Sequence, residues 1–428
     1  MNMRLNGTKQ IKRVAWRHSV GMSALVLMVA GAHGGPLTPP AGPVGSTGKT
    51  IAEAEPRIAL SVATAPGDAN SVLRITAPGS YYLTGNITGQ TGKHGIEVAA
   101  SHVTIDLNGY ALVGVAGSLS GIVMDGFVLS TVVRNGTVTE WGGDGVNLDG
   151  SGTDPGKRVE LVIARNNGAV GIGVGDSGRV IDCTAVDNAL FGISGASATV
   201  VSGCVARGNI GSGIVVGVGS SISGSTARLN GGSGFQGSSA SVINCAAHNN
   251  AVNGFSGFAS SVLIGCIATE NSANGFSLSS NSRVSDCTAT GNTGEGFSAG
   301  GTTSFTDCSA TENGLNGFVV INNSAIRGCV ARANGAAGTG AGFRTTGSDN
   351  RLERNSTNGG DFGFQISGER NILIQNQSGR ATTLNWSIVA NSIYGPIIDR
   401  SAAVLGAASG DSATSTLNTT DPNANFTN

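Results

Sequence analysis

Three basic side chains recur at an almost constant spacing in the middle of the chain. Arg207, Arg228 and His248 occupy the same position of a repeated phrase in three successive repeats. If the repeats form stacked strands, these side chains lie in one exposed strip with neighbours about 4.8 Å apart. Such a strip would attract an anionic chain, for example a uronate or sulfated polysaccharide. The alternative is an ordinary solvated strand face.

A second candidate ligand site surrounds Trp141. This residue lies close to Glu140, Asp144 and Asp149, where the repeat carries its largest insertion. An aromatic ring beside carboxylates can stack on a sugar, and loops are where a scaffold often places function. We therefore expect Trp141 to contact carbohydrate, with a packed cap residue as the alternative.

Seven cysteines share one register, and Ser225 fills the single gap in it. This cysteine column consists of Cys183, Cys204, Cys245, Cys266, Cys287, Cys308 and Cys329. In-register side chains of parallel strands point the same way, which strains the dihedral angle of a disulfide. No His stands in register beside them to complete a metal site. We expect mostly buried, inert thiols, with bridges in some pairs as the alternative and metal binding as the least favoured outcome.

Acids and bases are scarce on the strand face that follows the apolar plugs. The position eleven residues after the cysteine column holds Ser194, Val215, Gln236, Ser256, Ser277, Ser298 and Val319. Glu270 and Glu312 share another column, two repeats or about 9.6 Å apart, near the upper limit for an inverting glycosidase. Exposed turns also collect charge without any catalytic role. We therefore predict no catalytic residue, no metal site and no cofactor.

The elements that position these residues follow from the repeat. An apolar residue such as Val180 precedes the cysteine column by three positions, and an Ala such as Ala185 follows it by two. An asparagine column follows by five: Asn167, Asn188, Asn209, Asn230, Asn250, Asn271, Asn292, Asn313 and Asn334. An apolar plug follows by ten: Ile172, Ile193, Ile214, Phe235, Phe255, Phe276, Phe297 and Phe318. We expect the apolar columns to face inward, and the Asn to adopt a left-handed turn and to form a hydrogen-bonded ladder.

A period near 21 residues with short β-branched runs predicts an all-β solenoid. The period resembles that of the right-handed parallel β-helix repeat family, of the pectate-lyase-like superfamily. Phrases such as Ile105-Asp-Leu-Asn-Gly109 and Trp141-Gly-Gly-Asp-Gly145 look like those of secreted bacterial members whose activity is unassigned. The resemblance implies a single right-handed parallel β-helix with about 21 residues per coil, and it says almost nothing about function.

The ends of the chain differ from this middle part. Residues 1–32 have five basic residues before a short apolar run, which predicts a cleaved signal peptide and an exported protein, either secreted, periplasmic or at the cell surface. We expect a Gly- and Pro-rich linker with an N-terminal cap over 33–70, the β-helix over 71–400 and a disordered tail over 401–428. Signal cleavage would leave no membrane span, and a net charge of about −6, which disfavours nucleic acid as a partner.

These observations favour an exported, non-catalytic β-helix protein of the cell surface or envelope. Its expected partner is an acidic polysaccharide or another surface component, bound at Arg207, Arg228, His248 and Trp141. The alternative is a polysaccharide lyase or a glycoside hydrolase. Short insertions disfavour that alternative, because they are too small to wall a deep cleft.

Overall fold

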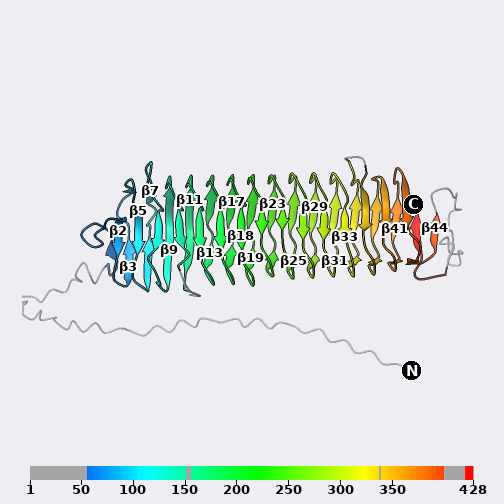
Figure 1. The fold of residues 1–428 in the computed structure, drawn as a ribbon, viewed down its shortest axis with the longest axis horizontal. Coiled ribbons are helices and arrows are strands. Elements are labelled where there is room, and N and C mark those ends of the chain that lie inside the picture. The colour runs from blue at the N-terminus through cyan, green and yellow to red at the C-terminus, as the bar shows by residue number, and fades with distance from the viewer. Residues whose placement is uncertain (1–54, 151–155, 337–338, 400–419, 428) are drawn as a thin grey trace, which may run out of the picture. The chain divides into compact units, whose positions relative to one another are not determined.

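The computed structural model describes residues 55–150, 156–336, 339–399 and 420–427. Within these ranges the chain contains strands and no helix, and all the strand pairings form parallel ladders apart from one isolated bridge. Successive coils stack along one axis, and Figure 1 shows their strands side by side. The predicted signal peptide and most of the predicted linker lie outside the described residues.

Each coil contributes one strand to a 15-stranded sheet and up to two strands to a 30-stranded sheet. The 15-stranded sheet contains β2 (Ser71–Ile75), β5 (His94–Val98), β8 (Ile122–Met124), β10 (Val146–Leu148), β12 (Ile172–Val174), β15 (Ile193–Gly195), β18 (Ile214–Val216), β21 (Phe235–Gln236), β24 (Phe255–Ser256), β27 (Phe276–Leu278), β30 (Phe297–Ala299), β33 (Phe318–Val320), β36 (Ala341–Thr345), β39 (Phe362–Ile366) and β42 (Leu384–Ile388).

The 30-stranded sheet has two rows of strands, which the long strands β9 (Thr131–Thr139) and β11 (Arg158–Arg165) join. The row before the cysteine column contains β1 (Ile58–Ala59), β3 (Gly79–Tyr82), β6 (Val103–Asp106), β13 (Arg179–Ile181), β16 (Val200–Ser202), β19 (Ser221–Ser223), β22 (Ser241–Ile243), β25 (Val262–Ile264), β28 (Arg283–Ser285), β31 (Ser304–Thr306), β34 (Ala325–Arg327), β37 (Arg351–Glu353), β40 (Ile372–Ile374) and β43 (Ile393–Tyr394).

The row after the cysteine column contains β4 (Ile87–Thr88), β7 (Ala111–Val113), β14 (Thr184–Val186), β17 (Val205–Arg207), β20 (Thr226–Arg228), β23 (Ala246–His248), β26 (Ile267–Thr269), β29 (Thr288–Thr290), β32 (Ser309–Thr311), β35 (Val330–Arg332), β38 (Ser356–Asn358), β41 (Gln377–Gly379), β44 (Ile397–Asp399) and β45 (Asn425–Thr427).

The expected inward columns form the core. The apolar, Ala and Cys columns are buried, as are the Phe plugs. The rings from Phe235 onward stack face to face at 4.6 to 5.0 Å between centroids, and the stack continues beyond Phe318 to Trp386. Gly275 precedes a plug because a Cβ there would lie 2.8 Å from both Asn292 Nδ2 and the carbonyl of Gly296.

The asparagine column forms the expected ladder, but it does not supply the left-handed turn. Asn271 Nδ2 donates to Asn292 Oδ1 at 2.9 Å, and the backbone N–H of Asn271 donates to the same oxygen at 3.0 Å. The residue before each Asn has positive φ instead, as in Glu270 with φ 54° and Glu312 with φ 53°. The left-handed expectation was wrong because the Asn amide is fully engaged by the stack and the turn lies one residue earlier.

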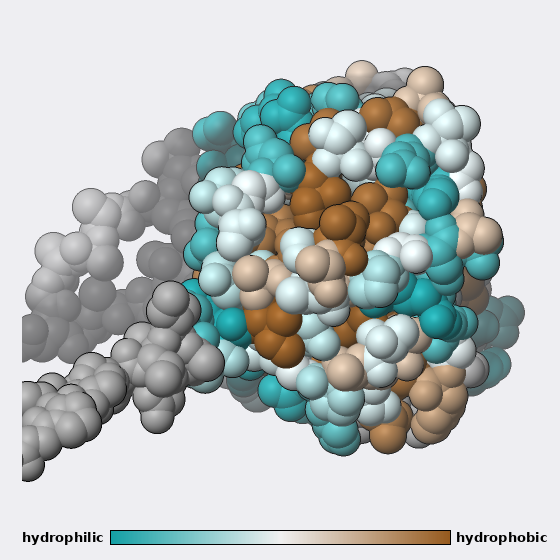
Figure 2. All heavy atoms as spheres, turned by 90° about the vertical axis from the view of Figure 1, so that its left-hand side faces the viewer, coloured by the Kyte–Doolittle hydropathy of each residue, from teal (hydrophilic) through white to brown (hydrophobic). Residues whose placement is uncertain are grey.

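The two ends of the stack depart from the expected boundaries. Strand β1 already pairs with β3, so parallel pairing begins ahead of Ser71. Figure 2 shows apolar residues in the middle of this end face with polar residues around them; among the capping residues Leu60 is buried and Val62 is exposed. At the other end, the prediction of a disordered tail is wrong for residues 420–427, because β45 pairs with both β41 and β44.

The seven thiols of the cysteine column are free and buried. Burial, together with the hydrogen bond to the Cys308 thiol, raises the pKa of Cys329. We expect native protein to react with a thiol reagent slowly and incompletely, and denatured protein to titrate all seven cysteines. Several fast-reacting thiols in the native protein would contradict the burial of this column.

Candidate functional site

The structure brings the three residues of the basic strip together. Arg207 pairs in register with Arg228, and Arg228 pairs with His248, on β17, β20 and β23. The alternation of these strands turns both arginines to solvent, while the intervening Ala residues are buried. The predicted juxtaposition is therefore present on the outer face of the 30-stranded sheet.

Acidic side chains limit the charge of this strip. His248 Nε2 lies 3.8 Å from Glu270 Oε2, and both side chains are largely exposed. Asn249 Nδ2 lies 3.2 Å from the same imidazole nitrogen. The negative charge of Glu270 would offset a positive charge on His248. The cationic part of the strip is therefore the pair of Arg207 and Arg228.

Trp141 does not lie on a ligand-accessible surface. Its side chain is 1% exposed, and its Nε1 donates to the carbonyl of Leu112 at 3.1 Å. Its backbone N–H donates to Asn167 Oδ1, so Trp141 precedes the asparagine column in the same ladder. The prediction of sugar contact was wrong because the ring fills space inside the coils, where a Cβ on Gly95 would lie 2.7 Å from it. The position of Trp141, one coil before Asn167 in the ladder register, was the signal for this burial.

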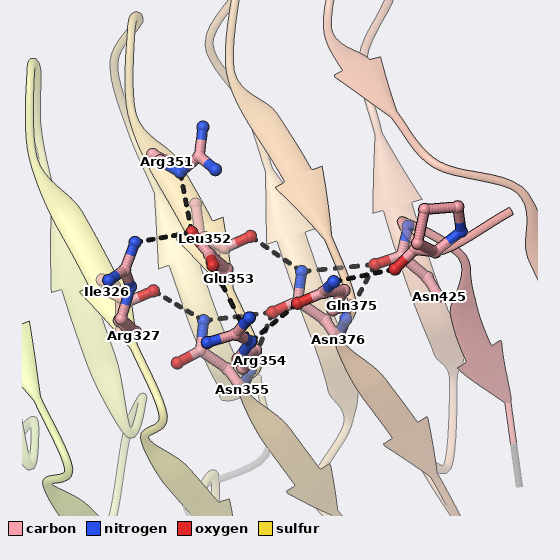
Figure 3. Close-up of polar contacts among 11 residues, drawn as sticks. Ile326, Arg327, Arg351, Leu352, Glu353, Arg354, Asn355, Gln375, Asn376 and Asn425 are labelled. Carbon is pink, nitrogen blue, oxygen red and sulfur yellow. Dashed lines mark hydrogen bonds and ion pairs between the residues drawn. The ribbon is translucent and has the colours of Figure 1, made fainter.

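The structure shows a further basic group, the arginine cluster, that the repeat analysis missed. Its members are Arg327 of β34 and Arg351 and Arg354 at β37, gathered around the buried Glu353 (Figure 3). Arg327 Nη2 and Arg351 Nε both donate to Glu353 Oε2 at 2.9 Å. Arg354 Nε lies 3.8 Å from Glu353 Oε1 and donates to Gln375 Oε1 at 2.7 Å. Three guanidinium groups therefore surround one carboxylate.

The buried carboxylate fixes the guanidinium groups without neutralising them all. The hydrogen bond from Arg351 lowers the pKa of Glu353, against the opposing effect of burial, and Arg327 adds to this lowering. Glu353 therefore stays ionised at neutral pH, and the cluster keeps a net charge of about +2. The side chains of Arg327 and Arg351 remain 55% and 46% exposed, so their other N–H groups are available to a ligand.

A shallow hollow lies beside these two arginines. Its volume is about 160 Å³, and Ser304, Thr306 and Ala325 line it together with Arg327 and Arg351. Hydroxyl groups and forked guanidinium groups around a small hollow suit a carboxylate, sulfate or phosphate group. The arrangement can bind an anionic group, and the carboxylate that lines the hollow, Glu353, is already paired with the arginines.

A carboxylate pocket occupies the outer face of the 15-stranded sheet in the first coils. The column of Ser194 continues upstream through Gly173, Asn147 and Val123 to Glu97. His94, Glu97 and Asp125 line a hollow of about 220 Å³ there. Arg74 Nε lies 3.1 Å from Glu97 Oε1, whereas Glu97 Oε2 has no hydrogen-bond partner among the described residues. The sequence analysis missed this pocket because these coils do not carry the regular phrase.

The arginine cluster and the carboxylate pocket do not include a group of metal ligands. Among the residues that the structure describes, no three His, Cys, Asp or Glu side chains converge as they would around a metal ion. Over the same ranges no helix is long and apolar enough to span a membrane.

Comparison with known proteins agrees with this architecture. Residues 144–304 match the family described as right-handed β-helix region. This match agrees with the resemblance that the repeat indicated, and the described part of the chain is a parallel β-helix. No curated protein matches the sequence.

Several solved structures are similar to this chain at low sequence identity. The A-module of a mannuronan C-5 epimerase from Azotobacter vinelandii is 16% identical, with 74% of this chain and 91% of that chain covered and a TM-score of 0.43. A pectate lyase is 17% identical, with 64% and 70% covered and a TM-score of 0.32. The receptor-binding tailspike of bacteriophage Det7 is 9% identical, with 77% and 75% covered and a TM-score of 0.41.

Proposed function

We propose that the protein is an exported, non-catalytic β-helix protein of the cell surface or envelope that binds an acidic polysaccharide. The observation that carries this proposal is the arginine cluster, in which the buried Glu353 holds Arg327 and Arg351 beside a hydroxyl-lined hollow. Export is supported by the signal-like composition of residues 1–32.

Glu353 holds the guanidinium groups of Arg327 and Arg351 in place, which favours a role in binding an anionic ligand over a role as ordinary solvated surface. A free surface Arg loses side-chain entropy when it binds, whereas guanidinium groups already fixed by a carboxylate lose less. The basic strip lacks such support, since no hydrogen bond to a carboxylate fixes Arg207 or Arg228 among the described residues. We therefore propose the arginine cluster as the preferred site for the polysaccharide and the basic strip as the second candidate.

Matched double variants test this ranking. We expect R327S/R351S to weaken binding to polygalacturonate at least tenfold at low salt, and R207S/R228S to weaken it less, although both remove two positive charges. Binding would be measured by titration calorimetry, with dextran of similar length as the neutral control. A larger loss in R207S/R228S would move the site to the basic strip.

A further variant separates binding from stability. R327S/R351S removes both arginines that donate hydrogen bonds to the buried Glu353 and leaves only Arg354 near it, which is destabilising. R327Q/R351Q/E353Q removes that carboxylate as well, and we expect the same loss of binding with a thermal unfolding midpoint closer to that of the wild type. Unchanged binding to polygalacturonate in this folded variant would exclude the arginine cluster.

The carboxylate pocket favours a second candidate function, a polysaccharide lyase or a glycoside hydrolase. Glu97 with a free oxygen, Asp125 and His94 are groups that acid and base catalysis can use. Chain cleavage would be followed as new reducing ends or unsaturated products released from polysaccharides. Product release by the wild type and its loss in E97Q would replace the non-catalytic proposal with this one.

A further inference from the structure

In the last coil the order of the strands in the sheet differs from their order along the chain. Strand β45 pairs with β41 on one side and with β44 on the other, so it lies between them. Strand β43 nevertheless pairs directly with β40. In the preceding coils both rows stack on the same coil, as β40 does on β37 and β41 on β38. The C-terminal strand therefore occupies the place that chain order gives to β44.

The repeat register assigns this place to β44 as well. Ile397 follows Asn376 by 21 residues, which is also the spacing between Asn355 and Asn376. Continuing the register would place Ile397 on Asn376 and Asp399 on Ser378. The structure places Asn425 next to Asn376 instead, although 49 residues separate them. Two strands of the same chain thus compete for one sheet edge.

The hydrogen bonds of Asn425 explain why β45 wins this competition. Asn425 Oδ1 accepts from the backbone N–H of Asn376 at 2.9 Å and from Asn376 Nδ2 at 3.3 Å (Figure 3). Asn425 Nδ2 donates to the carbonyls of Leu373 at 3.1 Å and Gly395 at 3.0 Å. Asn376 and Asn425 are both fully buried. An Ile at this place would leave the backbone N–H and one side-chain N–H of Asn376 buried without an acceptor, which is costly, while the other side-chain N–H keeps the carbonyl of Leu352.

Contacts of Thr427 and Pro422 also favour β45 over β44 at this edge of the sheet. Thr427 pairs in register with Ser378, which pairs with Thr357, and all three are buried. Trp386 Nε1 donates to Thr427 Oγ1 at 2.8 Å. Asp399 in this position would bring a carboxylate into a column of small, buried side chains. Outside the ladder, Gln375 Nε2 donates to the carbonyl of Pro422 at 2.7 Å.

We propose that the edge of β41 is a strand-acceptor site selective for Asn-x-Thr, and that it takes the C-terminal segment 420–427 of a second copy as well as that of its own chain. The contacts are the same whichever copy supplies the segment, since only residues of 420–427 enter the site. Main-chain pairing supplies affinity, and the pockets for Asn425 and Thr427 supply selectivity. This inference is independent of polysaccharide binding.

The test uses the full chain with a protease site introduced between residues 400 and 419. After cleavage, size-exclusion chromatography and intact mass spectrometry measure whether the C-terminal fragment stays bound. A dye-labelled peptide of residues 420–428 is then added to measure exchange from a separate molecule. The N425L change is compared with N423L, which makes the same substitution at an exposed position of the same segment.

We expect the wild-type and N423L fragments to stay bound at micromolar concentration and to exchange with the labelled peptide. N425L should raise the Kd of the fragment by about 10- to 100-fold, because two buried donors lose their acceptor. Equal retention of the N425L and wild-type fragments would overturn the proposal, as would failure of the labelled peptide to enter the cleaved wild-type protein. Circular dichroism of uncleaved N425L distinguishes loss of the strand from loss of the fold.

Discussion

Replacing Phe276 by Ala is expected to lower the free energy of unfolding by about 3 to 5 kcal/mol. Phe276 is fully buried, and its ring lies 4.7 Å from that of Phe255 and 4.6 Å from that of Phe297. Removing the ring leaves a cavity between two filled coils, and neighbours fixed by ladder hydrogen bonds cannot collapse into it. The midpoint and slope of urea unfolding would measure the loss.

Ser277 provides the matched control for this change. It follows Phe276 on β27 and points to the other face of the sheet. Ser277→Ala should change the free energy of unfolding by less than about 0.5 kcal/mol, since outward strand positions pack little. A loss below about 1 kcal/mol for Phe276→Ala would show that the ring stack contributes much less than its burial implies.

Asn271→Leu is expected to destabilise the protein by about 2 to 6 kcal/mol, since each unsatisfied buried donor costs about 1 to 3 kcal/mol. Asn271 Oδ1 accepts from the backbone N–H of Asn250 at 3.1 Å and from Asn250 Nδ2 at 3.0 Å. Leu is similar in size but accepts nothing, so the backbone N–H and one side-chain N–H of Asn250 remain buried and unpaired, while its other side-chain N–H keeps the carbonyl of Ala227. Thermal unfolding of the variant beside the wild type would measure the loss.

Asn358→Leu is the control for the ladder. Asn358 ends β38 and is exposed, so the same substitution there removes no buried partner and should cost less than about 0.5 kcal/mol. Similar losses for the two variants would mean that the substitution itself, rather than the ladder, determines stability.

The regular part of this protein can be read from its amino-acid sequence. Each coil contacts its neighbours through the same columns, so the inward Cys, Ala and Phe positions recur at a fixed spacing and can be identified without coordinates. The same periodicity placed Arg207, Arg228 and His248 on adjacent strands, which the structure confirms. Because each coil contacts only the coils next to it, the register between strands is set by the spacing of the repeat, and this spacing can be measured in the sequence.

The features that break the period follow from contacts in the folded protein, which the spacing of the repeats does not predict. The arginine cluster joins Arg327 to Glu353 across a coil with an insertion, and the carboxylate pocket lies in coils without the repeated phrase. The ladder register gave a signal for the burial of Trp141, but the space that its ring fills beside Gly95 is defined by the fold. Most clearly, β45 displaces β44 from the edge of β41. Spacing favours β44 there, and only the hydrogen-bonding needs of Asn376, visible in three dimensions, select Asn425 instead.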